Sequence, residues 1–146
     1  IQQYRNRISG PLLDRIDLQI DVPPLPAEEL DTADVPETTE TVRERVCAAR
    51  ARQMDRDGMP AAALNAALTR QRCRLDQKSR GLMKSATRQL GLSARGWHRC
   101  LRIARTIADL EGHDRVTSTH VGEALAYRER LRPSDIAARA NHPARP

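Results

Sequence analysis

Residues 93–110 read SARGWHRCLRIARTIADL, and this pattern predicts an amphipathic α-helix. Ser93 is a preferred N-cap residue, because its hydroxyl can accept a hydrogen bond from a free backbone N–H group of the first turn. Apolar side chains then recur every three or four residues, at Trp97, Leu101, Ala104, Ile107 and Ala108. Such a stripe favours burial against other elements, so we expect this helix to lie in a core. Gly112 favours its end.

Two helices are predicted before this stretch. The nearer one is capped by Asp76 and closed by Gly91, a residue type that favours the left-handed conformation after a helix. Its expected apolar side holds Leu82, Met83, Ala86 and Leu90. The earlier helix begins at the capping-box pattern of Thr41 and Glu44 and ends near Gly58.

A connection and a fourth helix complete the helical region. Residues 60–75 are rich in Ala and are expected to form a connection with one short helical turn. Thr117 or Ser118 begins the fourth helix. Its inward side is expected to hold Val121, Ala124 and Leu125. The predicted fold class is therefore mainly α, a small helical bundle over residues 38–132. A tail at 133–146, rich in Pro, Ala and Arg, is expected to be disordered.

The segment before the bundle has a different character. Residues 17–22, DLQIDV, alternate polar and apolar side chains, which predicts a half-buried β-strand. No other segment reads as its partner, and a lone strand cannot satisfy its backbone hydrogen bonds. We therefore expect residues 1–22 to be the remnant of an upstream α/β core, with the strand frayed. Residues 23–37 are acidic and Pro-rich, and they are predicted to link two domains.

Charge is divided unevenly along the chain. Residues 14–44 hold ten acidic and two basic side chains, a net charge of −8, whereas residues 45–108 hold fifteen basic and three acidic ones, a net charge of +12. A basic block of this size suits an anionic partner, whether nucleic acid, nucleotide phosphates or the acidic surface of a neighbouring subunit. A simply solvated basic surface is an equal alternative on charge alone.

Composition argues against several other classes. No run approaches the ~20 apolar residues that span a bilayer, and the polar start IQQYRNRISG is no signal peptide, so no membrane partner is expected. The three cysteines are an odd number without a CxxC pair, which indicates unpaired thiols in a reducing compartment and a cytoplasmic location. The four histidines form no ligand pattern with them, so no metal site is predicted.

One stripe of basic side chains is a candidate binding surface. Arg80, Lys84 and Arg88 are spaced by four residues and would share one side of their helix. Repulsion between like charges at this spacing costs only ~0.2–0.5 kcal/mol per pair. A solvated face is therefore the simpler interpretation, and a binding face is the alternative.

Arg95 has a more specific environment, in the first turn of the helix that Ser93 caps. A cation there opposes the helix dipole by ~0.3–1 kcal/mol, whereas the free N–H groups of that turn attract anions. Arg99 and Arg102 continue along the same side. A bound phosphate would offset the cost and accept charge-assisted hydrogen bonds, which makes Arg95 a candidate phosphate ligand.

No complete active site is visible in the sequence. Residues 91–96, GLSARG, have the glycine spacing of a phosphate loop, but Trp97 and His98 stand where Lys and Ser or Thr are required. GxSxG and HExxH motifs are absent, and carboxylates gather in the linker. The chain alone is therefore not expected to catalyse a reaction.

Five motifs follow one another in a recognisable order. They are RISGPLLDRIDL (7–18), VRERVCAAR (42–50), LSAR (92–95), ARTIADL (104–110) and HVGEALAYR (120–128). Together they resemble the C-terminal part of the magnesium-chelatase-like AAA+ ATPases, in the ComM branch of that family. The resemblance covers residues 1 to about 130. It implies that residues 1–22 end an AAA+ α/β core and that residues 38–132 form its helical lid domain.

The resemblance also implies roles for two arginines. Such enzymes form rings, usually hexamers, and bind ATP between neighbouring subunits. Arg15 matches the arginine finger, which reaches the γ-phosphate held by the adjacent subunit, and Arg95 matches the sensor-2 arginine of the lid. ATP and Mg²⁺ are the implied cofactors of the full-length protein. The Walker A and Walker B motifs that hold them are expected upstream, so neither cofactor is expected on this chain alone.

Several functions stay open at this point. The leading hypothesis is the lid of a self-assembling ring ATPase that remodels DNA, by branch migration or helicase action in natural transformation. A non-catalytic module is the alternative, for contact between subunits or for nucleic-acid binding through Arg80, Lys84, Arg88, Arg99 and Arg102. A subunit of the magnesium-chelatase type is another. Because aromatic residues make up only 2% of the chain, contacts with DNA would involve phosphates rather than stacked bases.

Overall fold

The described part of the chain is helical. The computed structural model describes residues 15–20, 22 and 37–129. Their elements are α3 (Thr39–Asp57), η2 (Ala61–Ala63, a 3-10 turn), α4 (Ala66–Arg72), α5 (Gln77–Leu90), α6 (Ala94–Leu110) and α7 (Ser118–Glu129). The predicted fold class, a small and mainly α bundle, is confirmed. The tail at 133–146 and all but the last residue of the expected linker lie outside the described residues.

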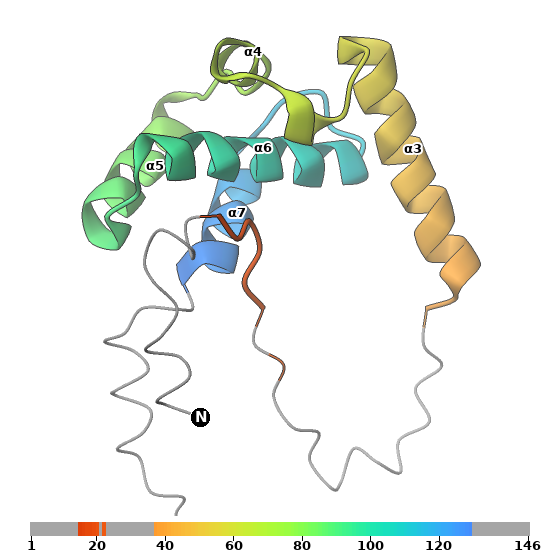
Figure 1. Cartoon of the computed structure of the whole chain (residues 1–146), viewed down its shortest axis with the longest axis horizontal. Coiled ribbons are helices and arrows are strands. Elements are labelled where there is room, and N and C mark those ends of the chain that lie inside the picture. Colours follow the sequence, from red (N-terminus) through yellow and green to blue (C-terminus); the bar gives the residue numbers. More distant parts are fainter. Residues whose placement is uncertain (1–14, 21, 23–36, 130–146) are drawn as a thin grey trace, which may run out of the picture.

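Helix α6 is the element around which the others are arranged (Figure 1). It packs against α3, η2, α4 and α7, while α5 packs against α7. The expected stripe of α6 lies inside, with Leu101, Ala104, Ile107 and Ala108 buried and Trp97 half-buried. From α7 the core receives the three residues expected, Val121, Ala124 and Leu125. On α5, Met83 and Ala86 are buried, whereas Leu82 is exposed.

Helix ends form where capping chemistry predicts them, with one exception. The side chains of Ser93 and Asp76 accept hydrogen bonds from backbone N–H groups in the first turns of α6 and α5. After α5, Gly91 adopts a positive φ of 60°. For α3 the expected start was wrong. Thr38 accepts the backbone N–H of Thr41 at 3.2 Å, so the helix begins earlier than the Thr41 capping-box pattern indicated.

The connection at 60–75 contains more structure than predicted. It holds both η2 and the seven-residue helix α4. Asn65 caps α4 by accepting the backbone N–H of Leu68 at 2.9 Å. An Asn cap before an Ala-rich run is the sequence signal for this helix. The single short turn that we expected is shorter than the helix that forms.

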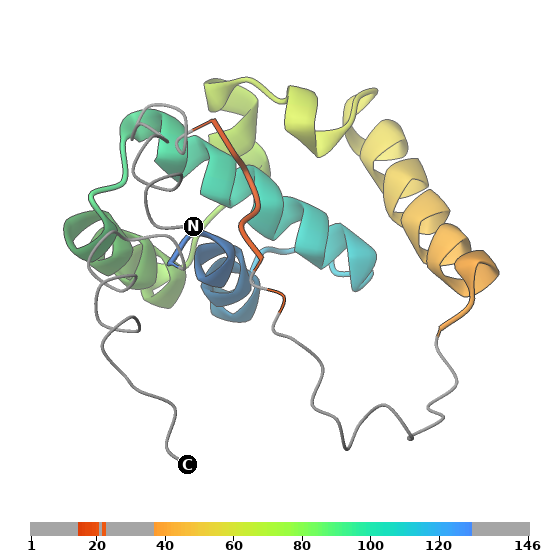
Figure 2. The same cartoon turned by 60° about the horizontal axis from the view of Figure 1, so that its bottom comes forward.

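Residues 15–20 form no strand in the part of the chain that the structure describes. They run as an extended segment beside α6 and α7 (Figure 2). Asp17 pairs with Arg99 at 3.0 Å, and the Gln19 N–H donates to the carbonyl of Tyr127 at 2.9 Å. The apolar side chains of this segment are exposed at Ile16, Leu18, Ile20 and Val22. The half-buried strand that the alternation predicted is therefore not formed in this segment, where Gln19 alone among residues 15–20 is half-buried.

A buried ionic network joins α3, α4 and α6. Arg56 donates to both carboxylate oxygens of Asp109, at 2.6 and 3.0 Å, and Arg105 lies 3.0 Å from the same carboxylate. The side chains of Asp109 and Arg105 are each only 1% exposed. Asp57 binds both Arg56 and Arg72, which adds the end of α4. The hydrogen bond with Asp109 raises the pKa of Arg56 above its usual value, so this pair stays charged.

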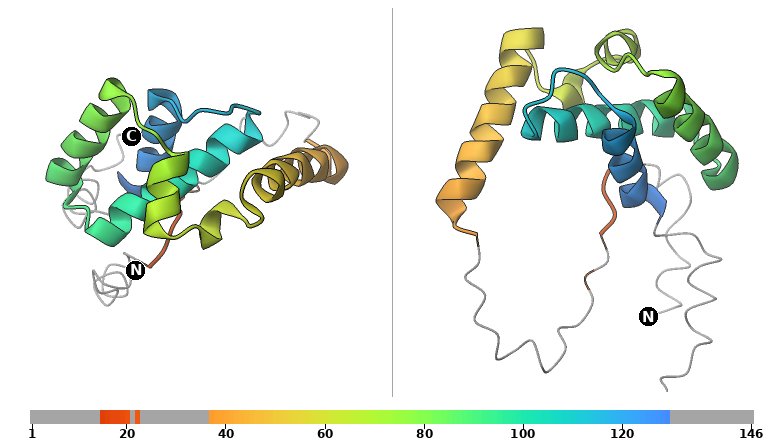
Figure 3. Two further views of the ribbon diagram at one scale, coloured as in Figure 1. Left: turned by 90° about the horizontal axis from the view of Figure 1, so that it is seen from above. Right: turned by 180° about the vertical axis from the view of Figure 1, so that it is seen from behind.

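This network is the main attachment of α3 to the bundle. Among the residues of α3, only Ala49 and Gln53 are buried, and Val42 and Val46 are exposed. The N-terminal half of the helix extends beyond the other elements (Figures 1 and 3). Because α3 buries little apolar surface, the ion pairs at its C-terminal end and the buried hydrogen bond from the Ala61 N–H to Gln53 Oε1, at 3.2 Å, attach it to the bundle.

Within the described ranges, no helix combines the length and the apolar character that a membrane span requires.

Replacing Asp109 with Asn should destabilise the bundle by about 3–5 kcal/mol, because the buried guanidinium of Arg105 would lose its counter-charge. Urea unfolding followed by circular dichroism measures this change. Glu37→Gln is the control, since it removes the exposed Arg45–Glu37 pair and should cost less than about 1 kcal/mol. A loss below about 1 kcal/mol for Asp109→Asn would show that the network does not hold the fold.

Candidate phosphate-binding site at the start of α6

The candidate site begins with the first turn of α6. Ser93 ends the loop after α5, and its Oγ accepts the backbone N–H of Gly96 at 3.0 Å, which fixes the helix start. Arg95 is the second residue of α6 and is exposed. The first turn contains no acidic residue, so no carboxylate within it balances this cation or the positive end of the helix dipole.

A second arginine lies against the same turn. Arg128, in the last turn of α7, donates from Nη1 to the carbonyl oxygen of Gly96 at 3.3 Å. A Cβ atom on residue 96 would lie 3.4 Å from that Nη1, an ordinary van der Waals distance, so the contact does not by itself require glycine. Sequence reasoning assigned no role to Arg128. The available signal was its position as the last residue of the HVGEALAYR motif.

The segment that carries Arg15 approaches this end of α6. Asp17 pairs with Arg99, which lies one helical turn after Arg95 on the same side of the helix. Arg15 is exposed and only two residues from Asp17, a reach of at most about 7 Å. The arginine-finger and sensor-2 candidates therefore belong to neighbouring parts of the described structure. The first residues of the RISGPLLDRIDL motif, up to residue 14, lie outside the described ranges.

Two of the arginines expected to contact nucleic acid bind other residues of this chain instead. Arg102 donates to the carbonyl oxygens of Ala62 and Leu64, at 2.9 and 3.4 Å, and so ties η2 to α6. Arg99 is half-buried in its pair with Asp17. These contacts give both side chains a structural role that helical spacing alone could not indicate.

The three other candidates occupy the exposed side of α5. Arg80, Lys84 and Arg88 are all exposed, as their spacing predicted. Arg80 also donates to the carbonyl oxygen of Leu75 at 3.3 Å. Arg88 lies in the last turn of α5, close in sequence to Ser93. The positive surface of α5 therefore leads towards the start of α6.

Other side chains with possible chemistry lie elsewhere. Cys73 and Cys100 are buried, and burial raises the pKa of each thiol to about 12, so neither is a reactive thiolate. Glu111, His113 and His120 form one group of potential metal ligands within the described ranges. They lie at the opposite end of α6, about 25 Å from Arg95 at 1.5 Å per helical residue.

The start of α6 concentrates positive charge, and the described residues beside it supply no further group for catalysis. Arg95 adds an exposed guanidinium to the positive end of the helix dipole, and Arg128 is bound to the Gly96 carbonyl of the same turn. In the described ranges no nucleophile with an adjacent base lies beside Arg95 or Arg128. The geometry therefore suits a group that assists an active site completed by other parts of a protein.

Comparisons with known proteins agree with the motifs. The family described as "Magnesium chelatase, subunit ChlI C-terminal" matches residues 36–128, and "Magnesium chelatase, subunit ChlI" matches residues 1–30. Competence protein ComM of Haemophilus influenzae is 45% identical over 133 residues, which are 90% of this chain and 26% of that protein. Uncharacterized protein YifB of Escherichia coli is 42% identical over 127 residues, 86% of this chain and 25% of that protein.

The chain thus spans about a quarter of the length of the curated relatives that it matches. The C-terminal family match extends over α3 to α7 and includes both Arg95 and Arg128. A match of this extent shows the family. The chain belongs to the magnesium chelatase subunit ChlI C-terminal family.

Proposed function

We propose that this chain is the helical lid of a magnesium-chelatase-related AAA+ ATPase, in which Arg95 contacts the γ-phosphate of bound ATP. The single observation that carries the proposal is the placement of Arg95, exposed in the capped first turn of α6. The relatives are about three and a half times as long as this chain, so they have room for a nucleotide-binding domain beside such a lid.

Electrostatics favours an anion at this position. A cation in the first turn of a helix costs ~0.3–1 kcal/mol, and Arg128 adds a second positive charge nearby. A phosphate there would offset this cost and accept a charge-assisted hydrogen bond from Arg95. In ATP hydrolysis negative charge shifts among the phosphate oxygens, and a guanidinium held in place stabilises that charge without reorganising.

Arg15 is proposed to act on the neighbouring subunit of a ring. Its segment is bound to α6 through the Asp17–Arg99 pair, one turn from Arg95. A movement of the lid at one nucleotide would therefore be transmitted to the finger that serves the next nucleotide. This connection gives a physical route by which the ATP sites around the ring, a hexamer in our proposal, hydrolyse ATP one after another.

DNA is the proposed polymer on which the ring acts. The exposed cations of α5 offer contacts to DNA phosphates. One of the similar proteins, from Haemophilus influenzae, bears the name Competence protein ComM. A subunit of a magnesium chelatase is the second candidate, favoured by the family description itself. The two candidates differ in whether the cations of α5 matter for activity.

Arg95→Ala in the full-length protein should lower ATP turnover by about 100-fold, the typical effect of removing one preorganised donor. Steady-state phosphate release measures this loss. Arg95→Lys should recover part of the activity, because it keeps the charge but not the planar fork. Arg43→Ala, which removes an exposed arginine of α3, is the matched control and should leave turnover unchanged. Unchanged turnover in Arg95→Ala would remove the sensor-2 assignment.

Arg15 can be tested by complementation between two inactive variants. Arg15→Ala subunits retain their own ATP site, and subunits with a disabled upstream phosphate loop retain Arg15. If the finger acts in trans, mixed rings should regain ATP turnover that neither variant shows alone. A mixture that stays inactive, although light scattering shows mixed rings, would contradict action on the neighbour.

The chain should bind double-stranded DNA at about 50 mM salt and release it as salt rises towards 200 mM. Fluorescence anisotropy over this range gives the salt slope. Replacing Arg80, Lys84 and Arg88 together with Ala should weaken binding and reduce the slope by about one for each phosphate that the protein no longer neutralises. The control is a triple variant on α3, in which Ala replaces Arg43, Arg45 and Arg50 and the same amount of charge is removed. Equal effects from the two triple variants would exclude a DNA surface on α5.

A further inference from the structure

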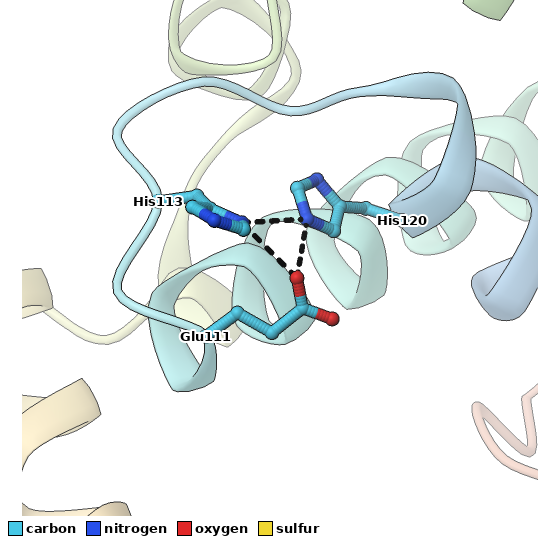
Figure 4. Close-up of side chains that lie close together, drawn as sticks. All are labelled: Glu111, His113 and His120. Carbon is cyan, nitrogen blue, oxygen red and sulfur yellow. Dashed lines mark hydrogen bonds and ion pairs between the residues drawn. The ribbon is translucent and has the colours of Figure 1, made fainter.

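Three side chains with metal-ligand chemistry meet where α6 ends and α7 begins (Figure 4). Glu111 follows the last residue of α6, His113 lies in the loop, and His120 lies in the first turn of α7. His120 Nε2 is 2.8 Å from Glu111 Oε2, and His113 Nδ1 is 3.1 Å from the same oxygen. The two imidazole nitrogens are 3.2 Å apart.

This triangle is close to the face of a metal coordination tetrahedron. With metal–ligand bonds of about 2.0–2.1 Å, the ligand atoms of a tetrahedral Zn²⁺ site stand about 3.3–3.5 Å apart. The observed separations of 2.8 to 3.2 Å need to widen by only a few tenths of an ångström. We propose that Glu111, His113 and His120 bind a divalent transition metal ion of the Zn²⁺ type. Two imidazoles and one carboxylate are a ligand set that suits Zn²⁺ and disfavours Mg²⁺.

One ligand is rigid and the other two are accessible. The His120 side chain is only 2% exposed, and its Nδ1 accepts the backbone N–H of Thr117 at 2.9 Å, which orients Nε2 towards the triangle. Glu111 and His113 are 42% and 59% exposed, so an ion can enter from solvent and a water molecule can take the fourth position.

Binding has an identifiable cost at His120. Without metal, the neutral ring carries its proton on Nε2, because Nδ1 accepts the Thr117 N–H. With metal on Nε2, that proton moves to Nδ1 and donates to Thr117 Oγ1, 3.2 Å away. The Thr117 N–H then loses its acceptor. The site is therefore one of moderate affinity, and the fold does not require the ion.

Surrounding charges act in both directions. The carboxylate and the negative end of the α6 dipole favour a cation. Arg52 reaches to within 3.2 Å of where a Cβ atom of Gly112 would lie, and Arg105 donates to the loop carbonyls of His113 and Asp114, so two guanidinium groups oppose it. An ion bound here would fasten the end of α6 to the start of α7, the helix that supplies Arg128 to the other end of α6.

Zinc titration of the untagged chain by isothermal calorimetry tests the proposal. The background carries Cys47→Ser, because the exposed Cys47 thiol could bind zinc by itself. We expect one zinc ion per chain and no competition from excess Mg²⁺. His113→Asn should weaken binding by about tenfold or more, and Glu111→Gln should also weaken it. His98→Asn, on the body of α6, is the matched histidine control and should leave binding unchanged.

Thermal unfolding gives a second readout. Zinc should raise the Tm of the Cys47→Ser protein and leave that of Cys47→Ser/His113→Asn unchanged. His113 is exposed, so this variant should fold, and its far-ultraviolet circular dichroism should match that of its parent. Absence of saturable zinc binding, or binding that survives His113→Asn, would overturn the proposal. Neither result depends on whether the full-length protein hydrolyses ATP.

Discussion

The described fold depends on one buried carboxylate. Asp109 lies near the end of the central helix and must be neutralised there, because an unpaired charge in the interior is strongly unfavourable. Arg56 neutralises it from α3 and Arg105 from α6 itself. Arg105 also binds two carbonyls of the loop before α7, and Asp57 extends the network to α4. This one carboxylate therefore connects α3, which buries little apolar surface, to the apolar core that α5, α6 and α7 share.

The residues of α6 that hold the fold together and the residue proposed to bind phosphate lie in different halves of the helix. The ionic network lies in the C-terminal half, at Arg105 and Asp109, whereas the first turn presents Arg95 to solvent. Arg128 and the Asp17–Arg99 pair connect that turn to α7 and to the preceding segment. A rigid helix with an exposed and positively charged start is well suited to report on an anion held by another domain.

Local chemistry made much of the fold predictable, and long-range contacts set the limit. The caps at Asp76 and Ser93 and the buried stripe of α6 follow from rules within one helix. The Arg56–Asp109 pair joins residues 53 positions apart, and no local pattern distinguishes it from a surface charge. For the same reason the intramolecular bonds of Arg99 and Arg102 were missed, as was the meeting of Glu111 with His113 and His120. Alternation at 17–22 predicted a half-buried strand, but whether its apolar side chains are covered depends on tertiary structure, and Ile20 and Val22 are exposed.

The most direct test of the proposed role of Arg95 is a structure of the full-length ring with a non-hydrolysable ATP analogue. We predict that the guanidinium of Arg95 lies within about 2.7–2.9 Å of a γ-phosphate oxygen, beside the first turn of α6. A nucleotide-loaded ring in which that guanidinium points into solvent, with no contact to the phosphates, would contradict the proposed function and leave only the description of a basic helical bundle.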